Sequence, residues 1–444
     1  MSPRRKLFFL LLVALFIVSA PLITLYTAGY RVFWKKQTVE RVGFLEISTI
    51  PTKANVYLDN NLMGTTPYVN TSVIPGDYQI RVEKAGYRIW NSEVDIRSGS
   101  SALFTNLLLW KESNPSFISA APSETSFSSR GDWLASVQES TEGYTAFLGP
   151  PNAPSQKEVC RFTKEAPVQI IWNSTGTLAL FVQKITPNLK ACVGGTTSQS
   201  FDLDTTIKSA AQSVYWATFS PTHLLIQTED GDYTLEATRL EKTKVGTDNE
   251  PFTIRGANFY SLKPNPNKTV TLYMRELNES AILAEQTLSS GNYEFQNISE
   301  KLIALTDTTR QITVLFQAKD LKPSQTISAN RIIQEPKNKA PRLLAYNEFE
   351  LYLIPTDYPI PVLLTRFSKP IRTVLWHPLL KHALVFNDSQ ILAMPLEAIN
   401  DQKPTVLATF DAVSDLWIDK NGNDLLILGS KDGQNGVWKL QLKD

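Results

Sequence analysis

The chain has 444 residues, of which 42 % are hydrophobic and 20 % are charged, a balance that is ordinary for proteins that bury cores. At this length we expect two to four domains. The formal net charge is +1 and no long block of one sign occurs, which argues against general nucleic-acid binding because that needs a concentrated basic face. Only three histidines and two cysteines are present, so histidine-based catalysis, zinc sites and a disulfide-stapled scaffold are disfavoured.

The N-terminal segment has the features of a membrane anchor. Residues 7–26 contain no charged side chain, and a helix of this length spans about 30 Å, the thickness of a hydrocarbon core. The alternative is a cleaved signal peptide, because residues 18–20 (Val-Ser-Ala) resemble a cleavage site. The apolar run exceeds the usual length of a signal-peptide core and Pro21 directly follows the candidate cleavage site, so we predict an uncleaved, single-pass helix.

Charge gives a weaker indication of how this helix is oriented. Residues 4–6 (Arg-Arg-Lys) precede it, but basic residues also follow it between positions 31 and 41, so the two flanks nearly balance. The short basic tail favours a cytoplasmic N-terminus. We therefore predict a protein of the cell membrane with the bulk of its chain outside the cytoplasm.

Residues 43–112 are predicted to form a small β domain. Apolar and polar residues alternate at 44–48, 55–59 and 78–82, as they do in half-buried strands. Turn-forming residues interrupt this alternation, and glycine suits such turns because it tolerates backbone angles that other residues avoid. The predicted turn positions are Pro51, Gly64, Pro67, Gly76 and Gly86.

Five short segments of this region resemble the PEGA domain, a small β-sandwich-like module common in bacterial and archaeal surface proteins. The match rests on their order and spacing, although residues 51–54 (PTKA) keep only the ends of the motif that names the domain. The resemblance implies a binding or spacer module of the cell envelope without catalysis, and it supports the extracytoplasmic location. The segments are 50–54 (IPTKA), 56–59 (VYLD), 64–67 (GTTP), 75–78 (PGDY) and 84–87 (KAGY).

A degenerate repeat occupies residues 114–444. Each unit has an aromatic residue, a polar turn and then a strongly apolar strand, and the clear units are about 40–45 residues apart, the period of a four-stranded propeller blade. The best pair is 127–135 (FSSRGDWLA) and 172–180 (WNSTGTLAL), which align with the glycine included. The predicted anchors, which would pack between neighbouring blades, are Phe127, Trp172, Trp216, Phe259, Phe295, Trp376 and Trp417.

These repeats resemble those of WD40-like and TolB-like β-propellers, although no unit ends a strand with Trp-Asp. We expect seven or eight blades, with residues 436–442 completing the last one. Two consecutive β-sandwich domains are the alternative, since they would contain similar strands without a fixed period. The predicted fold is thus all-β after the helix, in four segments: 1–30 (cytoplasmic tail and transmembrane anchor), 31–42 (juxtamembrane linker), 43–112 (PEGA-like β-sandwich) and 114–444 (β-propeller).

The two cysteines, Cys160 and Cys192, fall near one predicted blade. A disulfide requires Cα atoms within about 7 Å, and the sequence does not fix this separation. We therefore expect two unrelated thiols, with a disulfide as the alternative.

No residue pattern indicates catalysis, a metal or a cofactor. His377 and His382 are close in sequence, but no carboxylate or cysteine clusters with them to complete a metal site or an acid–base pair. Residues 419–424 (DKNGND) lack the ligand order and the distant glutamate of a calcium loop, so a turn is the better interpretation.

The functional prediction is a membrane-anchored binding or scaffold protein of the cell envelope. Its PEGA-like module and propeller would contact a protein or a polysaccharide, with no nucleic acid and no cofactor, because propellers present a broad surface of loops. The alternative is an extracytoplasmic carbohydrate-active enzyme that uses propeller carboxylates from distant blades.

Overall fold

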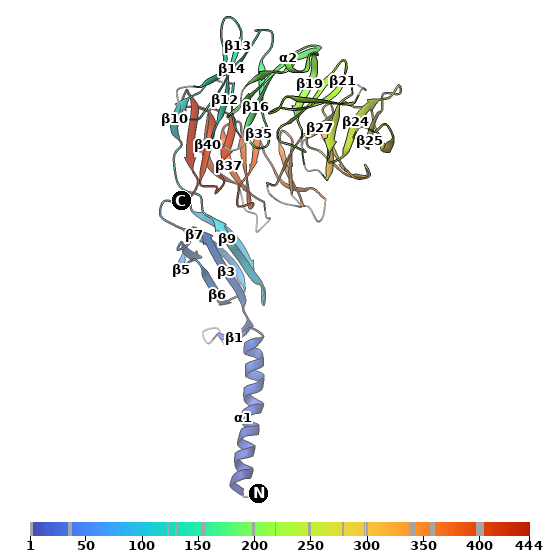
Figure 1. Ribbon diagram of the computed structural model, residues 1–444. Helices are drawn as coiled ribbons and strands as arrows, with labels where there is room; N and C mark the ends of the chain where they lie inside the picture. The colour runs from blue at the N-terminus through green and yellow to red at the C-terminus, as the bar shows by residue number, and fades with distance from the viewer. Residues whose placement is uncertain are drawn as a thin grey trace. The chain divides into compact units, whose positions relative to one another are not determined.

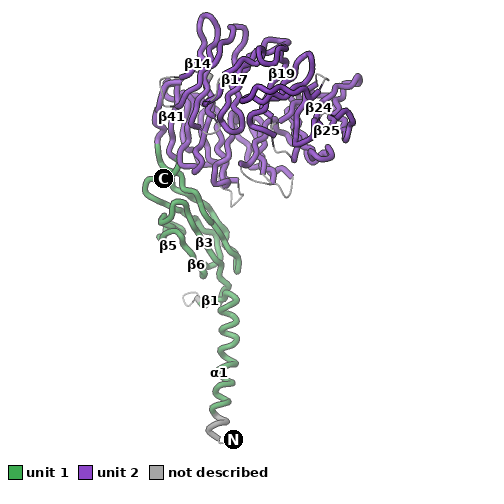
Figure 2. The backbone as a smooth tube through the Cα atoms, viewed as in Figure 1, with its two compact units in different colours: residues 1–113, 398–402, 442–444 green, residues 114–397, 403–441 purple. Residues whose placement is uncertain are grey.

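In a computed structural model of the chain, the structure describes residues 3–33, 38–121, 124–128, 131–151, 156–197, 200–217, 219–246, 250–277, 279–296, 298, 301–336, 342–355, 360–396 and 404–444. The backbone divides into two compact units (Figure 2). Among the described residues, unit 1 comprises 3–113 and 442–444, and unit 2 comprises 114–396 and 404–441.

Unit 1 begins with helix α1 (Pro3–Thr27), which continues through Pro21 (Figure 1). Its segment Phe8–Thr27 has a mean hydropathy of 2.7, and none of it is buried inside the protein. A 20-residue apolar helix that the rest of the protein does not bury is long and apolar enough to cross a membrane. A two-stranded hairpin follows, made of β1 (Tyr30–Phe33) and β2 (Thr38–Arg41).

The rest of unit 1 is a β-sandwich of a three-stranded sheet, in the order β6-β3-β9, and a four-stranded sheet, in the order β5-β4-β7-β8. Leu45, Ile47, Val56 and Val82 are fully buried between the sheets because alternate residues of each strand point to the same side. The strands are β3 (Gly43–Ile50), β4 (Asn55–Leu58), β5 (Asn61–Thr65), β6 (Tyr68–Val73), β7 (Gly76–Glu83), β8 (Trp90–Ile96) and β9 (Ser101–Leu108).

Unit 2 is a β-propeller, and its described residues form eight blades, which confirms the predicted fold. Seven blades have four strands in sequence order, and a single bridge between Leu189 and Ala211 links the sheets of blades 2 and 3. Blades 1 to 3 consist of β11 (Glu124–Phe127), β12 (Leu134–Glu139), β13 (Tyr144–Gly149), β14 (Lys157–Phe162); β15 (Val168–Trp172), β16 (Leu178–Ile185), β17 (Asn188–Gly195), β18 (Phe201–Asp202); and β19 (Ala211–Trp216), β20 (His223–Thr228), β21 (Gly231–Glu236), β22 (Glu241–Gly246).

A short helix, α2 (Leu203–Ile207), separates blades 2 and 3 and is capped by the Asp202 carboxylate. Blades 4 to 7 consist of β23 (Phe252–Arg255), β24 (Asn258–Pro264), β25 (Val270–Glu276), β26 (Ile282–Leu288); β27 (Tyr293–Gln296), β28 (Leu302–Asp307), β29 (Ile312–Gln317), β30 (Pro323–Ile327); β31 (Arg331–Gln334), β32 (Leu343–Tyr346), β33 (Glu350–Ile354), β34 (Val362–Arg366); and β35 (Ile371–Trp376), β36 (His382–Asn387), β37 (Gln390–Pro395), β38 (Thr405–Thr409).

Blade 8 closes the ring by joining the two ends of the propeller. Its first three strands are β39 (Ala412–Ile418), β40 (Asp424–Lys431) and β41 (Gln434–Gln441), and its fourth is β10 (Ser116–Ala120). The expectation that residues 436–442 complete this blade is therefore wrong in one respect, because β41 is its third strand and β10 lies outside it. Pairing β10 with β41 satisfies backbone groups that an open edge would expose.

The hydrophobic core of the propeller lies between blades. Leu180 of blade 2 and Ile226 of blade 3 belong to one buried cluster, and Phe127 of blade 1 and Val437 of blade 8 belong to another. Five further clusters each combine residues of two neighbouring blades. Each blade therefore buries its apolar surface against its neighbours, which excludes two separate sandwiches.

Cys160 and Cys192 form a disulfide, so the expectation of two unpaired thiols is wrong. Cys160 lies on β14, the outermost strand of blade 1, and Cys192 lies on β17, the third strand of blade 2. Their Cα atoms are 6.7 Å apart. The packing of blade 1 against blade 2 brings the two cysteines together, and no local sequence pattern shows a contact between strands of different sheets.

Removing this disulfide should destabilise the propeller. The bond closes a loop with a sequence separation of 32. The chain-entropy relation for such a loop gives about 3–4 kcal/mol. We expect Cys160→Ala, Cys192→Ala and the double variant to lose similar amounts of unfolding free energy in urea, because each breaks the same bond. Equal stability of the wild-type protein with and without reductant would contradict the pairing.

Candidate functional site

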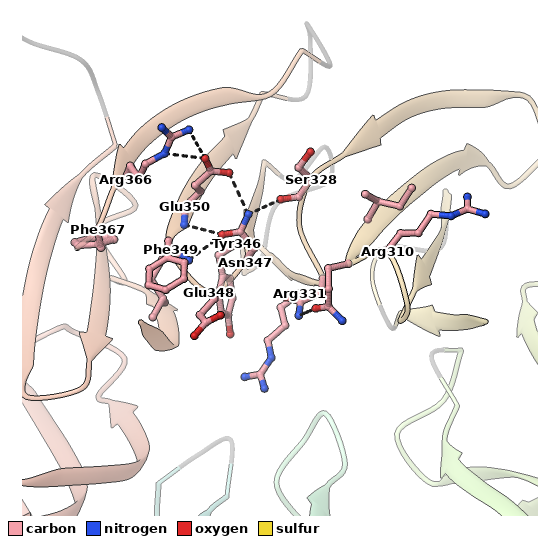
Figure 3. Close-up of a pocket in the computed structure, with 14 residues that line it drawn as sticks. Arg310, Ser328, Arg331, Tyr346, Asn347, Glu348, Phe349, Glu350, Arg366 and Phe367 are labelled. Carbon is pink, nitrogen blue, oxygen red and sulfur yellow. Dashed lines mark hydrogen bonds and ion pairs between the residues drawn. The ribbon is translucent and has the colours of Figure 1, made fainter. Parts of the chain in front are cut away.

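A cavity on blades 5 and 6 is the candidate functional site (Figure 3). It has a volume of about 780 Å³ and is lined by the turns β28–β29 and β32–β33 and by the loops after β30 and β34. A second cavity of about 460 Å³ shares Gln311, Asn330, Arg331 and Tyr346 with it. The second cavity also reaches β27 and β31, the first and innermost strands of these blades. Both volumes suit a small ligand or a few side chains of a partner.

The turn from Asn347 to Glu350 forms one wall of the larger cavity. The Asn347 side-chain oxygen accepts hydrogen bonds from the backbone N–H groups of Phe349 (2.9 Å) and Glu350 (2.8 Å). Its amide nitrogen donates to the Ser328 carbonyl (2.8 Å) on the loop from the preceding blade. Asparagine suits this position because its short side chain can replace backbone partners in a turn. The turn is therefore fixed both internally and to blade 5.

The Glu350 carboxylate is held by three side chains around it. It accepts hydrogen bonds from the Tyr352 hydroxyl (2.5 Å), from the Asn347 amide (3.1 Å) and from the Arg366 guanidinium, whose Nε lies 2.9 Å away. These bonds, led by the one from Tyr352, lower the pKa of Glu350 to about 2, because all three favour the ionised form. Burial and the same carboxylate raise the pKa of Tyr352 above its usual value.

Three arginines line the larger cavity, and they differ in their partners. Arg366 pairs with Glu350, and Arg310 pairs with the buried Asp307 carboxylate at 3.4 Å. Arg331 has no carboxylate partner among the described residues, and its guanidinium donates to the Arg372 carbonyl at 3.3 Å. It is exposed and lines both cavities. Arg331 therefore presents a positive charge that the described residues leave unpaired.

Phe349 gives the cavity an apolar element. Its side chain is 40 % exposed, and the Asn347 and Glu350 bonds on either side hold its backbone in place. Phe349 and Arg331 both line the larger cavity (Figure 3). A rigid aromatic group and an arginine are the residue types that dominate the energy of protein interfaces. The arrangement can hold a segment that has an apolar group beside a carboxylate.

Sequence reasoning missed all of these cavity residues. They come from loops of two blades, and each loop is an ordinary polar turn when it is read alone. One signal was available: Phe349 stands between Glu348 and Glu350 in a polar turn, where a large apolar side chain is not needed for the core.

Three of the predicted blade anchors occupy equivalent places at the end of a first strand. The indole N–H groups of Trp172, Trp216 and Trp376 donate to the backbone carbonyls of residues 126, 171 and 333 at 3.4, 2.9 and 3.4 Å. Each acceptor lies on the first strand of the preceding blade. These tryptophans fill the space between blades and are structural residues.

The other four anchors are less regular. Phe127, Phe295 and Trp417 lie on the first strands of blades 1, 5 and 8, in or against the clusters between blades. Phe259 lies on β24, the second strand of blade 4, and stacks on Phe252 with ring centres 5.1 Å apart. None of the seven anchors lines either cavity.

The predicted turn residues of the sandwich belong to unit 1 and do not line the cavity. Pro51 and Pro67 follow strands β3 and β5, and Gly64 and Gly76 lie within β5 and at the start of β7. Gly86 has a φ of +79°, a left-handed angle that glycine adopts without strain. These residues shape the sandwich.

The histidines and acidic residues singled out in the sequence have structural surroundings. His377 is fully buried, and its ring lies 6.5 Å from that of His382, whose pKa burial lowers to about 3. The Asp419 carboxylate accepts hydrogen bonds from the backbone N–H groups of Asn423 and Asp424 at 2.5 and 2.9 Å and so stabilises a turn. Among the described residues, no group of three or more His, Cys, Asp or Glu side chains is placed to hold a metal ion.

Comparisons with known proteins identify the smaller domain. The crystal structure of the C-terminal WD40 domain of Sif2 is similar to this chain at 11 % sequence identity and a TM-score of 0.47, covering 74 % of this chain and 98 % of that chain. A comparison with curated proteins gives no match. Residues 42–107 match the PEGA domain family, which confirms the resemblance in the sequence. The sandwich of β3 to β9 is therefore a PEGA domain.

Proposed function

We propose that this chain is a membrane-anchored, non-catalytic protein-binding module of a cell envelope. The combination of an apolar helix, a PEGA domain and a WD40-like propeller supports an interaction role. The observation that carries the proposal is the cavity of blades 5 and 6, which is lined by both Arg331, whose charge no described carboxylate pairs, and the exposed Phe349. A partner segment with an acidic side chain next to an apolar one would pair its carboxylate with Arg331 and pack its apolar side chain against Phe349.

The chemistry of the cavity favours a protein over a neutral polysaccharide. A neutral glycan has no charge to pair with Arg331, whereas a carboxylate would form a charge-assisted, two-pronged hydrogen bond with the guanidinium. The Asn347–Glu350 turn is fixed in advance, so little conformational entropy is lost when a partner contacts Phe349. An acidic protein segment is thus the ligand class that uses the most features of the site.

The proposed orientation has a cytoplasmic N-terminus and an extracytoplasmic propeller. The disulfide between Cys160 and Cys192 supports this, because disulfides persist in oxidising compartments and are rare in the cytosol. The basic residues before the apolar helix agree with it as well.

Binding is tested by capture of membrane-fraction proteins with the full-length chain in detergent. Arg331→Ala and Phe349→Ala should each weaken capture of the same partner at least about tenfold, since truncating an interface hot spot costs about 2 kcal/mol or more. Matched controls are Arg161→Ala, whose side chain is 72 % exposed on blade 1, and Leu240→Ala, which is 47 % exposed on blade 3. Unchanged capture by both cavity variants contradicts the proposed site, and a ligand that survives protease but not glycan digestion contradicts a protein partner.

Glu350 should make the stability of the site depend on pH. Its pKa falls from 4.5 to about 2 on folding, so its ionised form contributes stability above about pH 4.5 that is lost as pH falls towards 2. Glu350→Gln should therefore lower the unfolding free energy most at neutral pH, and the difference from wild type should shrink between pH 4.5 and 2. Urea unfolding at several pH values measures this. The control is Glu348→Gln at an exposed neighbouring position, and a pH-independent loss in Glu350→Gln would contradict the charge-based account.

Orientation is tested with a membrane-impermeant maleimide on intact cells. The native cysteines are paired, so a single new cysteine is the only reactive thiol expected on the folded chain. Asp432→Cys, at a side chain that is 85 % exposed, should be labelled in intact cells. Ser2→Cys should be labelled only after permeabilisation. Labelling in the reverse order contradicts the orientation, and a mature chain that lacks Ser2→Cys would indicate a cleaved signal peptide.

A further inference from the structure

Among the described strands, those of the β1–β2 hairpin pair only with each other, and one side of this hairpin has exposed apolar residues. The two strands form their own two-stranded sheet, in which Tyr30 pairs with Arg41 and Val32 pairs with Val39. Alternate residues of a strand and their cross-strand partners point to the same side, so these four side chains share one side of the ribbon. Tyr30, Val32 and Val39 are 37 %, 53 % and 58 % exposed.

The opposite side of the hairpin carries charged residues that are less exposed. Arg31 lies on that side and is half-buried, with its guanidinium carbon 3.8 Å from the ring centre of Tyr26. Glu40, its cross-strand partner, is also half-buried. The exposed side is therefore the more apolar one, the reverse of what water favours for an isolated ribbon.

Hydrogen bonds fix the hairpin to the end of the apolar helix. Arg31 donates to the Tyr26 carbonyl at 2.7 Å, and Arg41 donates to the Ala28 carbonyl at 3.1 Å. The Val42 N–H donates to the Gly29 carbonyl at 3.0 Å. Helix carbonyls at a C-terminus need such partners, and the two arginines supply them. The hairpin is thus a continuation of the helix end and not a free linker.

Chain length then places the hairpin at the membrane surface. Tyr30 is three residues beyond Thr27, the last residue of the apolar span, so their Cα atoms are at most about 11 Å apart. The polar headgroup layer on each side of a bilayer is about 5–8 Å thick. Tyrosine and arginine are suited to this layer, where a ring is half in the apolar phase and a guanidinium meets lipid phosphate.

We infer that the hairpin of β1 and β2 binds the lipid surface through its Tyr30, Val32 and Val39 side. The partner is the headgroup and upper acyl region of the bilayer that the helix crosses. This inference rests on the proposed anchoring and adds a second contact with the same membrane. The hairpin limits how far the first residues of the extracytoplasmic part can tilt or lift away from the bilayer.

The test is fluorescence quenching on the full-length chain in phosphatidylcholine–phosphatidylglycerol vesicles. The fluorophore NBD is attached to a single new cysteine without reductant, which leaves the native disulfide closed. Nitroxide groups placed shallowly in the lipid should quench NBD at Val39→Cys and shift its emission to shorter wavelength. NBD at Glu40→Cys, the neighbouring position on the opposite side, should be quenched much less.

A probe within the helix separates this inference from the anchoring on which it rests. NBD at Leu12→Cys should be quenched by nitroxide placed deep in the acyl region. Quenching at Leu12→Cys with none at Val39→Cys overturns the lipid-binding hairpin and leaves the anchor intact. No quenching at either position overturns both. Equal quenching at Val39→Cys and Glu40→Cys overturns the sidedness that defines the binding surface.

Discussion

The fold of unit 2 depends on the pairing of β10 with β41. Each blade is a small twisted sheet that buries apolar residues only against the blades beside it, so an open row would leave two apolar surfaces in water. When a strand from the start of the propeller completes blade 8, both of these apolar surfaces are buried. Gly436 allows the close approach, because a Cβ at that position would lie 2.2 Å from the Ser119 carbonyl oxygen. Phe117 and Trp438 pack edge to face across the same pairing, with ring centres 5.1 Å apart.

The period of the aromatic residues was enough to predict a propeller, because the structure repeats the same contact. In blades 2, 3 and 7 the first strand ends in a tryptophan whose N–H reaches the preceding blade, and in blades 1, 2 and 8 a turn with a left-handed glycine follows the first strand. Gly131, Gly176 and Gly422 have φ values of +69°, +66° and +72°. At Gly422 a side chain is also excluded by space, since a Cβ would lie 2.5 Å from the His377 ring of the preceding blade. The local sequence contains the residues that make this contact, so the contact could be predicted from the sequence.

Where no local sequence pattern marks a feature of the fold, the sequence analysis predicted that feature wrongly or did not predict it. The first strand of blade 4 has its aromatic residue, Phe252, at its start and is followed at once by a short turn with Gly256, so the spacing departs from the repeat and Phe259 of the second strand was taken in its place. The closing strand β10 has five residues, and its partner lies at the other end of the propeller. The disulfide depends on how two sheets face each other. These three features come from contacts between distant segments, and hydrophobic periodicity records only contacts within one strand or helix.

The candidate site depends even more on contacts between segments that are distant in the sequence. Nothing in the sequence distinguishes Arg331 from Arg310 and Arg366, but the fold brings a carboxylate to Arg310 and to Arg366 and no described carboxylate to Arg331. The turns that hold Gln311 and Phe349 belong to blades 5 and 6, so the cavity exists only while these two blades are packed together. A partner that contacts both blades binds the closed ring and not the unfolded chain, and binding must then stabilise the packing between them. The interblade core and the cavity are therefore linked thermodynamically: what holds blade 5 against blade 6 also sets the geometry between Gln311 of blade 5 and Phe349 of blade 6.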